Sequence, residues 1–151
     1  MVYCDSSFLV ALNVPDAWTP AARAMATGYR DPIPLVPVGE IELFTRIHRA
    51  LGERRLDMTK HAFVLRQIKQ DISDGILVRK SPAAQELLGE ALRLAKKYAP
   101  RLNIRPLDIL HVAAARVLRY SSFASLDKRQ RDLASASGLR ILLAKLITPN
   151  P

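Results

Sequence analysis

Residues 2–12 read VYCDSSFLVAL and change from strand to helix within a few positions. The apolar segment Val2–Cys4 suits a short strand, and an aspartate follows it directly. Ser6 and Ser7 can then cap a helix through Phe8–Leu12, because serine oxygens accept hydrogen bonds from free backbone N–H groups. A strand that passes at once into a helix is typical of an α/β fold.

The rest of the chain repeats this alternation. Further strands are expected at Ile33–Val38, Ile76–Val78, Phe123–Leu126 and Leu139–Leu143. Further helices are expected at Thr19–Thr27, Gly39–Leu51, Met58–Ser73, Pro82–Tyr98, Pro106–Tyr120 and Lys128–Ser137. Short apolar strands separated by helices predict a parallel sheet that helices cover on both faces.

Length and composition indicate one globular domain over residues 1–151. The chain is 49% hydrophobic and 25% charged, which excludes intrinsic disorder. It has no apolar run of about 18 residues that would predict a membrane span. The first residues carry no basic leader, which argues against a signal peptide. The single cysteine, Cys4, suits a reducing cytoplasm, and its place in an apolar strand indicates a buried side chain.

The charge balance is strongly basic. Lysine and arginine number 23 against 14 aspartates and glutamates, which gives a net charge of +9. Such an excess favours a polyanionic partner, with nucleic acid ahead of a membrane surface. Plain solubility is the alternative explanation, and charge alone does not decide between them.

Four acids are expected at the carboxyl ends of the strands, where open α/β sheets bind their ligands. Asp5 ends the first strand, Asp127 ends the strand at 123–126, and Glu42 and Asp108 each take the third position of a helix. For Glu42, that position places the cap at Gly39. Each acid alone could be a helix cap or a partner of the helix dipole. Four clustered carboxylates, however, repel one another unless a cation neutralises them, and hard oxygen ligands suit Mg²⁺ or Mn²⁺.

Four stretches of the chain carry a resemblance to a known family. They read VYCDSSFLVAL, GEIELFTRIHRAL, RPLDILHVAAARVL and FASLDKRQRDLASASGLRIL. In order and spacing they resemble the PIN-domain ribonucleases, and among these the VapC toxins of prokaryotic toxin–antitoxin pairs. The resemblance runs from Val2 to about Leu142. It implies a PIN-like fold with a central parallel five-stranded sheet, an Mg²⁺- or Mn²⁺-dependent endoribonuclease activity, a homodimer, and inhibition by a cognate antitoxin.

The acidic site of the family falls on the same four residues. Its first-strand aspartate matches Asp5, with Ser6 as the neighbouring hydroxyl. Its glutamate matches Glu42, with Glu40 as the alternative register. The chain departs from the family at two positions near these acids. Cys4 stands where leucine is more frequent in the family, and Gly39 stands where serine or threonine is frequent.

The two remaining family aspartates match Asp108 and Asp127, with Ser125 as the hydroxyl of the second segment. Asp5, Asp108 and Asp127 are the expected metal ligands. Glu42 would bind the metal directly, bind it through water, or orient the attacking water.

Several polar residues lie near these acids in the sequence. His111 follows Asp108 by three positions, which favours packing or support of a ligand over a catalytic role. Arg105 could contact phosphate or steady a carboxylate, and a solvated arginine is the alternative. Lys128, Arg129 and Arg131 flank Asp127 and could line an RNA path, with at least one of them plain surface.

The sequence therefore predicts a cytoplasmic, metal-dependent endoribonuclease of VapC type that arrests translation or growth. The alternatives are a PIN nuclease of RNA processing without a toxin role, and a PIN module that binds RNA without cutting it. The expected antitoxin is a small protein that inserts an Arg or Lys among the four acids. Its apolar anchors would lie in a groove near Phe44 and Phe63.

Overall fold

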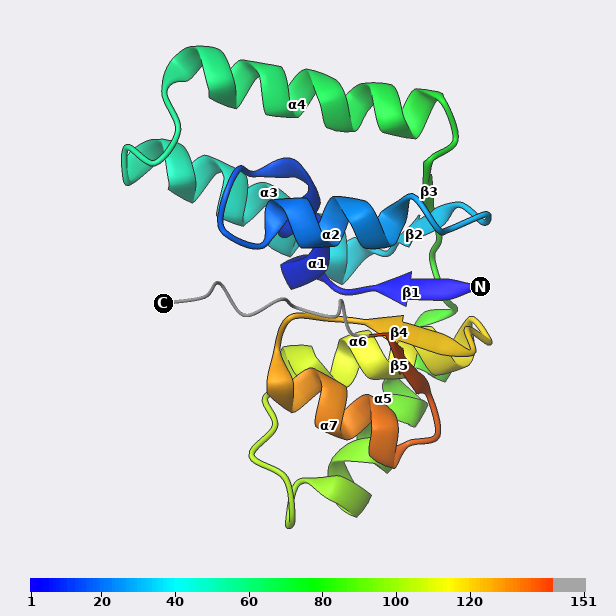
Figure 1. Ribbon diagram of the computed structural model, residues 1–151. Helices are drawn as coiled ribbons and strands as arrows, with labels where there is room; N and C mark the ends of the chain where they lie inside the picture. The colour runs from blue at the N-terminus through cyan, green and yellow to red at the C-terminus, as the bar shows by residue number, and fades with distance from the viewer. Residues whose placement is uncertain (143–151) are drawn as a thin grey trace.

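A computed structural model describes residues 1–142, in which strands and helices alternate (Figure 1). Residues 143–151, which include the end of the strand expected at 139–143, lie outside the described residues. The strands are β1 Val2–Cys4, β2 Ile33–Leu35, β3 Leu77–Arg79, β4 Ser122–Ala124 and β5 Arg140–Leu142. The helices are α1 Ser6–Asn13, α2 Thr19–Ala26, α3 Pro37–Gly52, α4 Met58–Ser73, α5 Ala84–Tyr98, α6 Pro106–Val117 and α7 Lys128–Ala136.

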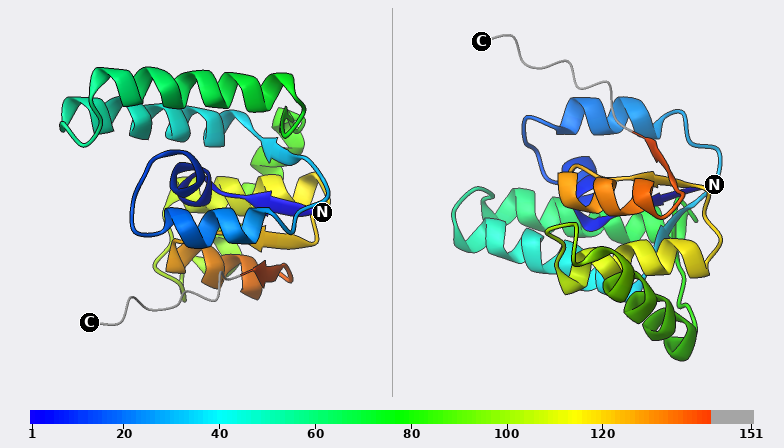
Figure 2. Two further views of the ribbon diagram at one scale, coloured as in Figure 1. Left: turned by 45° about the horizontal axis from the view of Figure 1, so that its top comes forward. Right: turned by 90° about the horizontal axis from the view of Figure 1, so that it is seen from below.

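The strands form two parallel ladders. The first has the order β1–β4–β5, with Cys4 opposite Ala124 and Ala124 opposite Leu142. The second pairs β2 with β3, and Ile33 lies opposite Leu77. Parallel pairing and helices on both sides confirm the predicted α/β architecture (Figures 1 and 2).

The prediction of one continuous five-stranded sheet was wrong for residues 1–142. Strands β1 and β2 are neighbours, but no ladder joins them in this part of the chain. Ile33 donates to Ile76, and Leu35 accepts from Lys80, so both point their polar groups toward β3. The residue between them, Pro34, faces β1 and has no N–H to donate. A proline at the centre of a three-residue strand therefore interrupts the sheet there.

Two hydrophobic cores lie on the two sides of β1. Tyr3 packs with α5, α6 and α7, whereas its neighbour Cys4 packs with α1, α3 and α4. The same alternation occurs in β4, where Phe123 belongs to the first of these cores and Ala124 to the second. Strands β1 and β4 are thus covered by core residues on both faces.

The starts of α1, α3 and α5 differ from the prediction, and α5 begins at Ala84 instead of Pro82. Helix α1 is capped by Asp5, whose carboxylate accepts from the N–H of Phe8, rather than by Ser6 or Ser7. Helix α3 begins at Pro37 instead of Gly39, because proline at the first helical position has the required φ angle and lacks only an N–H that would be free anyway. The strand before it accordingly ends at Leu35 and not at Val38.

The structure also bears on Cys4 and on the possibility of a membrane span. The Cys4 side chain is buried, which confirms its predicted place in the core. No helix of residues 1–142 has the length and apolar character needed to cross a membrane.

Candidate active site

Asp5 lies at the carboxyl end of β1 and is fully buried. Its carboxylate accepts hydrogen bonds from the hydroxyls of Ser7 at 2.7 Å and Ser125 at 2.7 Å, and from the N–H of Phe8 at 2.9 Å. Burial raises the pKa of this carboxyl above its usual range, although these hydrogen bonds oppose the rise. Asp5 is therefore a buried acid that three donors hold in one orientation.

Asp127 caps α7 beside Asp5, because β1 and β4 are adjacent strands. Its Oδ1 accepts from the N–H of Arg129 at 2.8 Å, and its own N–H donates to Ser125 Oγ at 2.9 Å. Burial would raise the pKa of Asp127, but the backbone and side-chain hydrogen bonds from Arg129 outweigh it and lower that pKa. Ser125 consequently links the two aspartates.

Asp108 occupies the third position of α6, as predicted, and is 5% exposed. Its Oδ2 accepts from the backbone N–H of Arg105 at 2.8 Å, one half of a capping box. The exposed Arg105 thus contributes its backbone to this acid. The nearest cation is the guanidinium of Arg129, whose Nε lies 3.8 Å from Asp108 Oδ2.

Glu42 is part of a separate hydrogen-bonded chain. Its Oε2 accepts from Ser6 Oγ at 2.6 Å and lies 2.7 Å from His111 Nε2, while the Tyr3 hydroxyl lies 2.8 Å from His111 Nδ1. The hydrogen bond with His111 lowers the pKa of Glu42, more strongly than its partial burial raises it. Because an ionised Glu42 can only accept, His111 Nε2 donates to it.

These contacts correct several predictions. Glu42 lies in the second turn of α3, not at the third position, because the helix starts earlier than expected. Ser6 donates to Glu42 rather than to Asp5, and Ser7 is the hydroxyl on Asp5. His111 lies between Glu42 of α3 and Tyr3 of β1.

Glu40, the alternative register, faces another partner. Its two carboxylate oxygens take a forked contact from Arg79 of β3, with Nη2 at 2.6 Å and Nε at 3.1 Å. Only Glu42 joins the network that contains His111, so the structure favours the register of Glu42.

The three basic residues after Asp127 are tied to nearby groups. Lys128 Nζ binds Asp132 at 2.7 Å on the outer face of α7, and Arg131 Nη1 donates to the Ser125 carbonyl at 3.2 Å. Arg129 Nη2 donates to Asp127 Oδ2 at 3.1 Å. Arg129 and Arg131 therefore support the acidic segment, and Lys128 is the surface residue of the three.

A groove of about 520 Å³ opens beside Glu42 and follows α3. Arg46 and Arg49 line it one and two turns after Glu42, and Arg55 lines its far part. The sequence prediction missed these arginines. Their spacing from Glu42 was the available signal, since residues at i+4 and i+7 share a helix face.

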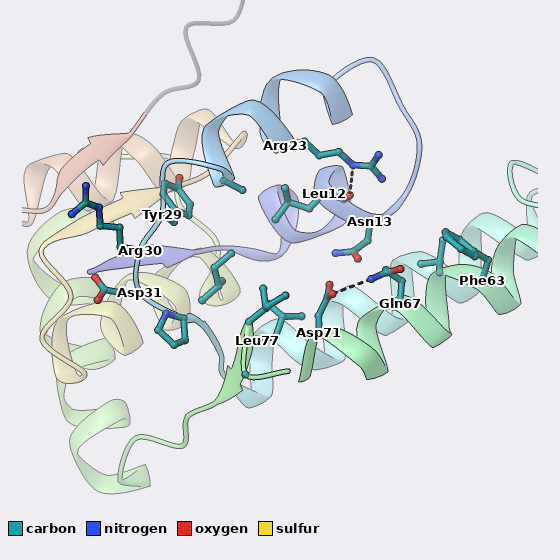
Figure 3. Close-up of a pocket in the computed structure, with 16 residues that line it drawn as sticks. Leu12, Asn13, Arg23, Tyr29, Arg30, Asp31, Phe63, Gln67, Asp71 and Leu77 are labelled. Carbon is teal, nitrogen blue, oxygen red and sulfur yellow. Dashed lines mark hydrogen bonds between the residues drawn. The ribbon is translucent and has the colours of Figure 1, made fainter. Parts of the chain in front are cut away.

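A larger groove of about 650 Å³ lies between α4 and the segment that joins α1 to β2 (Figure 3). Leu12, Tyr29 and Leu77 form apolar walls, and Phe63 lies at the α4 side with 58% of its surface exposed. The predicted groove at Phe63 is therefore present. Phe44 does not line it, because that ring packs against the core.

The donor set suits a hard divalent cation, although the acids are not arranged to hold one as they stand. Within residues 1–142, no three His, Cys, Asp or Glu side chains form a group that could hold a metal ion. Asp5, Asp108 and Asp127 nevertheless offer only carboxylate oxygens, which are the ligands of Mg²⁺ and Mn²⁺. A guanidinium already lies between two of them, so this position does accept positive charge.

The arrangement of strands and helices defines the class as an α/β domain with parallel strands. Two solved structures share this fold. VapC20 of Mycobacterium tuberculosis, described as a sarcin-ricin loop cleaving toxin, aligns with a TM-score of 0.66 at 18% identity, over 92% of this chain and 96% of its own. FitAcB from Neisseria gonorrhoeae aligns with a TM-score of 0.68 at 15% identity, over 95% and 98%.

These similarities confirm, at the level of the fold, the resemblance to VapC-type PIN domains. No family model matches the chain, and the comparison with curated proteins finds no match.

Proposed function

We propose that this chain is a metal-dependent endoribonuclease and the toxin of a toxin–antitoxin pair. One observation carries the proposal: Ser125 contacts both Asp5 and Asp127, and Arg129 contacts both Asp127 and Asp108, so that carboxylates of three separate elements share one network. VapC20, a protein of the same fold, is described as a toxin that cleaves the sarcin-ricin loop, which is RNA. The net charge of +9 suits such a polyanionic substrate.

Asp5, Asp108 and Asp127 would hold Mg²⁺ or Mn²⁺. Such an ion would activate a water molecule for attack and would neutralise the charge that develops on the phosphate. Glu42 stays ionised because His111 and Ser6 both donate to it, so it can accept a proton from an attacking water. Tyr3 contacts the other ring nitrogen of His111 and so holds Nε2 in the direction of Glu42.

The groove along α3 is our proposed path for one side of the RNA strand. It starts at Glu42, and the Arg46 side chain lies close enough that its charge lowers the Glu42 pKa. Arginines suit phosphate oxygens because the guanidinium can donate two parallel hydrogen bonds. This path replaces the one predicted along Lys128, Arg129 and Arg131.

The proposal is tested with a fluorescent single-stranded RNA and the purified chain. Cleavage should stop in EDTA and return with Mg²⁺ or Mn²⁺. Asp108→Asn should reduce the rate at least about 100-fold, since one ligand charge is lost, while Asp132→Asn on the outer face of α7 should cleave like wild type. Undiminished cleavage in EDTA would refute the metal mechanism. A wild-type chain that binds RNA without cutting it would instead support the non-cleaving module.

The antitoxin partner is part of the same proposal. Arg129 lies between Asp108 and Asp127, so a guanidinium fits among these acids. This position supports an antitoxin that inserts an Arg or Lys there. The apolar groove at Phe63 would hold the partner's anchoring segment. The homodimer implied by the resemblance stays a prediction.

A growth experiment separates a toxin from an RNA-processing nuclease. Induction of the chain alone in bacterial cells should arrest growth or translation, and co-expression of the antitoxin from the neighbouring gene should relieve the arrest. Asp5→Asn should be harmless and should still bind that partner. Normal growth with abundant active wild-type chain would refute the toxin role and leave the nuclease in place.

A further inference from the structure

Arg129 has an unusual position for a surface arginine. Its backbone N–H binds Asp127 Oδ1 at 2.8 Å, and its Nη2 binds Asp127 Oδ2 at 3.1 Å, so one residue holds both oxygens. Its Nε lies 3.8 Å from Asp108 Oδ2, on another helix. One guanidinium thus lies between two of the three expected metal ligands.

The contact with Asp108 neutralises charge but is not a hydrogen bond. At 3.8 Å it is too long, and the Nε atom is buried without any partner in residues 1–142. A buried donor without a partner carries a desolvation penalty. The side chain itself is about one-third exposed, so it can leave the site toward solvent. This arrangement suits a counter-ion that is held weakly, not a rigid structural ion pair.

The acids need such a counter-ion. Asp5 and Asp108 are buried, and the partners that orient them are neutral hydroxyl and N–H groups. Arg129 is the cation that contacts both Asp108 and Asp127 in residues 1–142. One guanidinium supplies a single positive charge, whereas a divalent ion supplies two with a much smaller radius. The same two carboxylates cannot surround such an ion while the guanidinium lies between them.

We propose that Arg129 is a built-in competitor for the metal ion, and that it leaves Asp108 and Asp127 when the metal binds. The inference rests on the proposed function only in taking these acids as metal ligands. It assigns Arg129 to the control of metal affinity rather than to the RNA path. Its consequence is a chain whose acidic site is folded and neutralised before any metal arrives.

The test is calorimetric titration of Mn²⁺ into the metal-free chain, without RNA. Arg129→Gln should bind Mn²⁺ about tenfold more tightly than wild type, a discounted value for one unit charge at about 4 Å in a partly exposed site. Lys128→Gln is the matched control, because it removes the same charge from the adjacent residue, whose partner is Asp132. It should change the affinity by less than about twofold.

A second variant guards against a folding defect. Arg129→Lys keeps the charge but cannot reach both carboxylates, so its affinity should lie between those of wild type and Arg129→Gln. Equal Mn²⁺ affinities for Arg129→Gln and Lys128→Gln, weaker binding by Arg129→Gln, or no binding by either Arg129 variant would overturn the inference.

The RNA assay is read separately. A chain that follows the predicted order of affinities but cuts no RNA would refute the proposed function alone. A chain that cuts RNA but has equal affinities would refute the competition alone.

Discussion

Replacing Asp5 by asparagine should stabilise the metal-free protein, and more so as the pH rises. Burial raises the pKa of Asp5 in the folded state. At low pH the carboxyl is neutral in both the folded and the unfolded state, so its burial does not lower the free energy of unfolding. As the pH rises through the raised pKa, the free energy of unfolding falls. Asparagine is neutral throughout, so Asp5→Asn escapes that loss.

The magnitude follows from the surroundings of the side chain. Each unit by which the folded pKa exceeds the unfolded one corresponds to about 1.4 kcal/mol. Asparagine can keep the contacts with Phe8 and Ser7 through its oxygen, and Ser125 Oγ can turn to accept from its amide. We therefore expect a net gain on the order of 1 kcal/mol at pH 7.5, or about 2–4 °C in Tm for a chain of this size.

The assay is thermal unfolding in EDTA, followed by circular dichroism between pH 4 and pH 8. The difference in Tm between Asp5→Asn and wild type should grow with pH. Asp127→Asn is the opposite control: the pKa of Asp127 is lowered in the folded state, so this variant should be less stable than wild type above about pH 5. A difference for Asp5→Asn that stays constant or shrinks as the pH rises would refute the reasoning.

Two further predictions concern the register of the glutamate and the larger groove. Glu42→Gln should lower the rate of RNA cleavage about 100-fold, whereas Glu40→Gln should cleave normally because Glu40 binds Arg79 instead; equal losses would contradict the assignment. Phe63→Ser should weaken antitoxin binding about tenfold in a pull-down or titration and leave RNA cleavage unchanged, because this exposed ring lies on the groove and not among the acids. Unchanged antitoxin binding would place the partner elsewhere.

Local sequence signals predicted most of the fold. Proline at the start of α6 and glycine at the ends of α4 and α7 mark these boundaries correctly, and Gly75 and Gly138 have φ angles of +73° and +93°. These signals work because they depend on the backbone of one residue. The break in the sheet at Pro34 also depends on one residue. It could not be predicted locally, because it requires knowing which strand lies on each side of β2.

Partner choice within the acidic site was harder to predict. The sequence places Ser6 next to Asp5, yet a helix turns Ser6 toward Glu42 and Ser7 back toward Asp5. Tyr3 reads as a core residue, and only the packing of β1 against α6 brings its hydroxyl to His111. Such long-range contacts leave no trace in local periodicity.

Because β1 pairs with β4, the acidic site can form only late in the synthesis of the chain. The strand before Asp5 is made first, but its partner is residues 122–124, and Ser125 follows. A ribosome must therefore add more than 120 residues after Asp5 before Asp5 can meet Asp127. If the chain cuts RNA as proposed, a growing polypeptide cannot do so until that stretch has been made. The delay comes from strand order alone and needs no inhibitor.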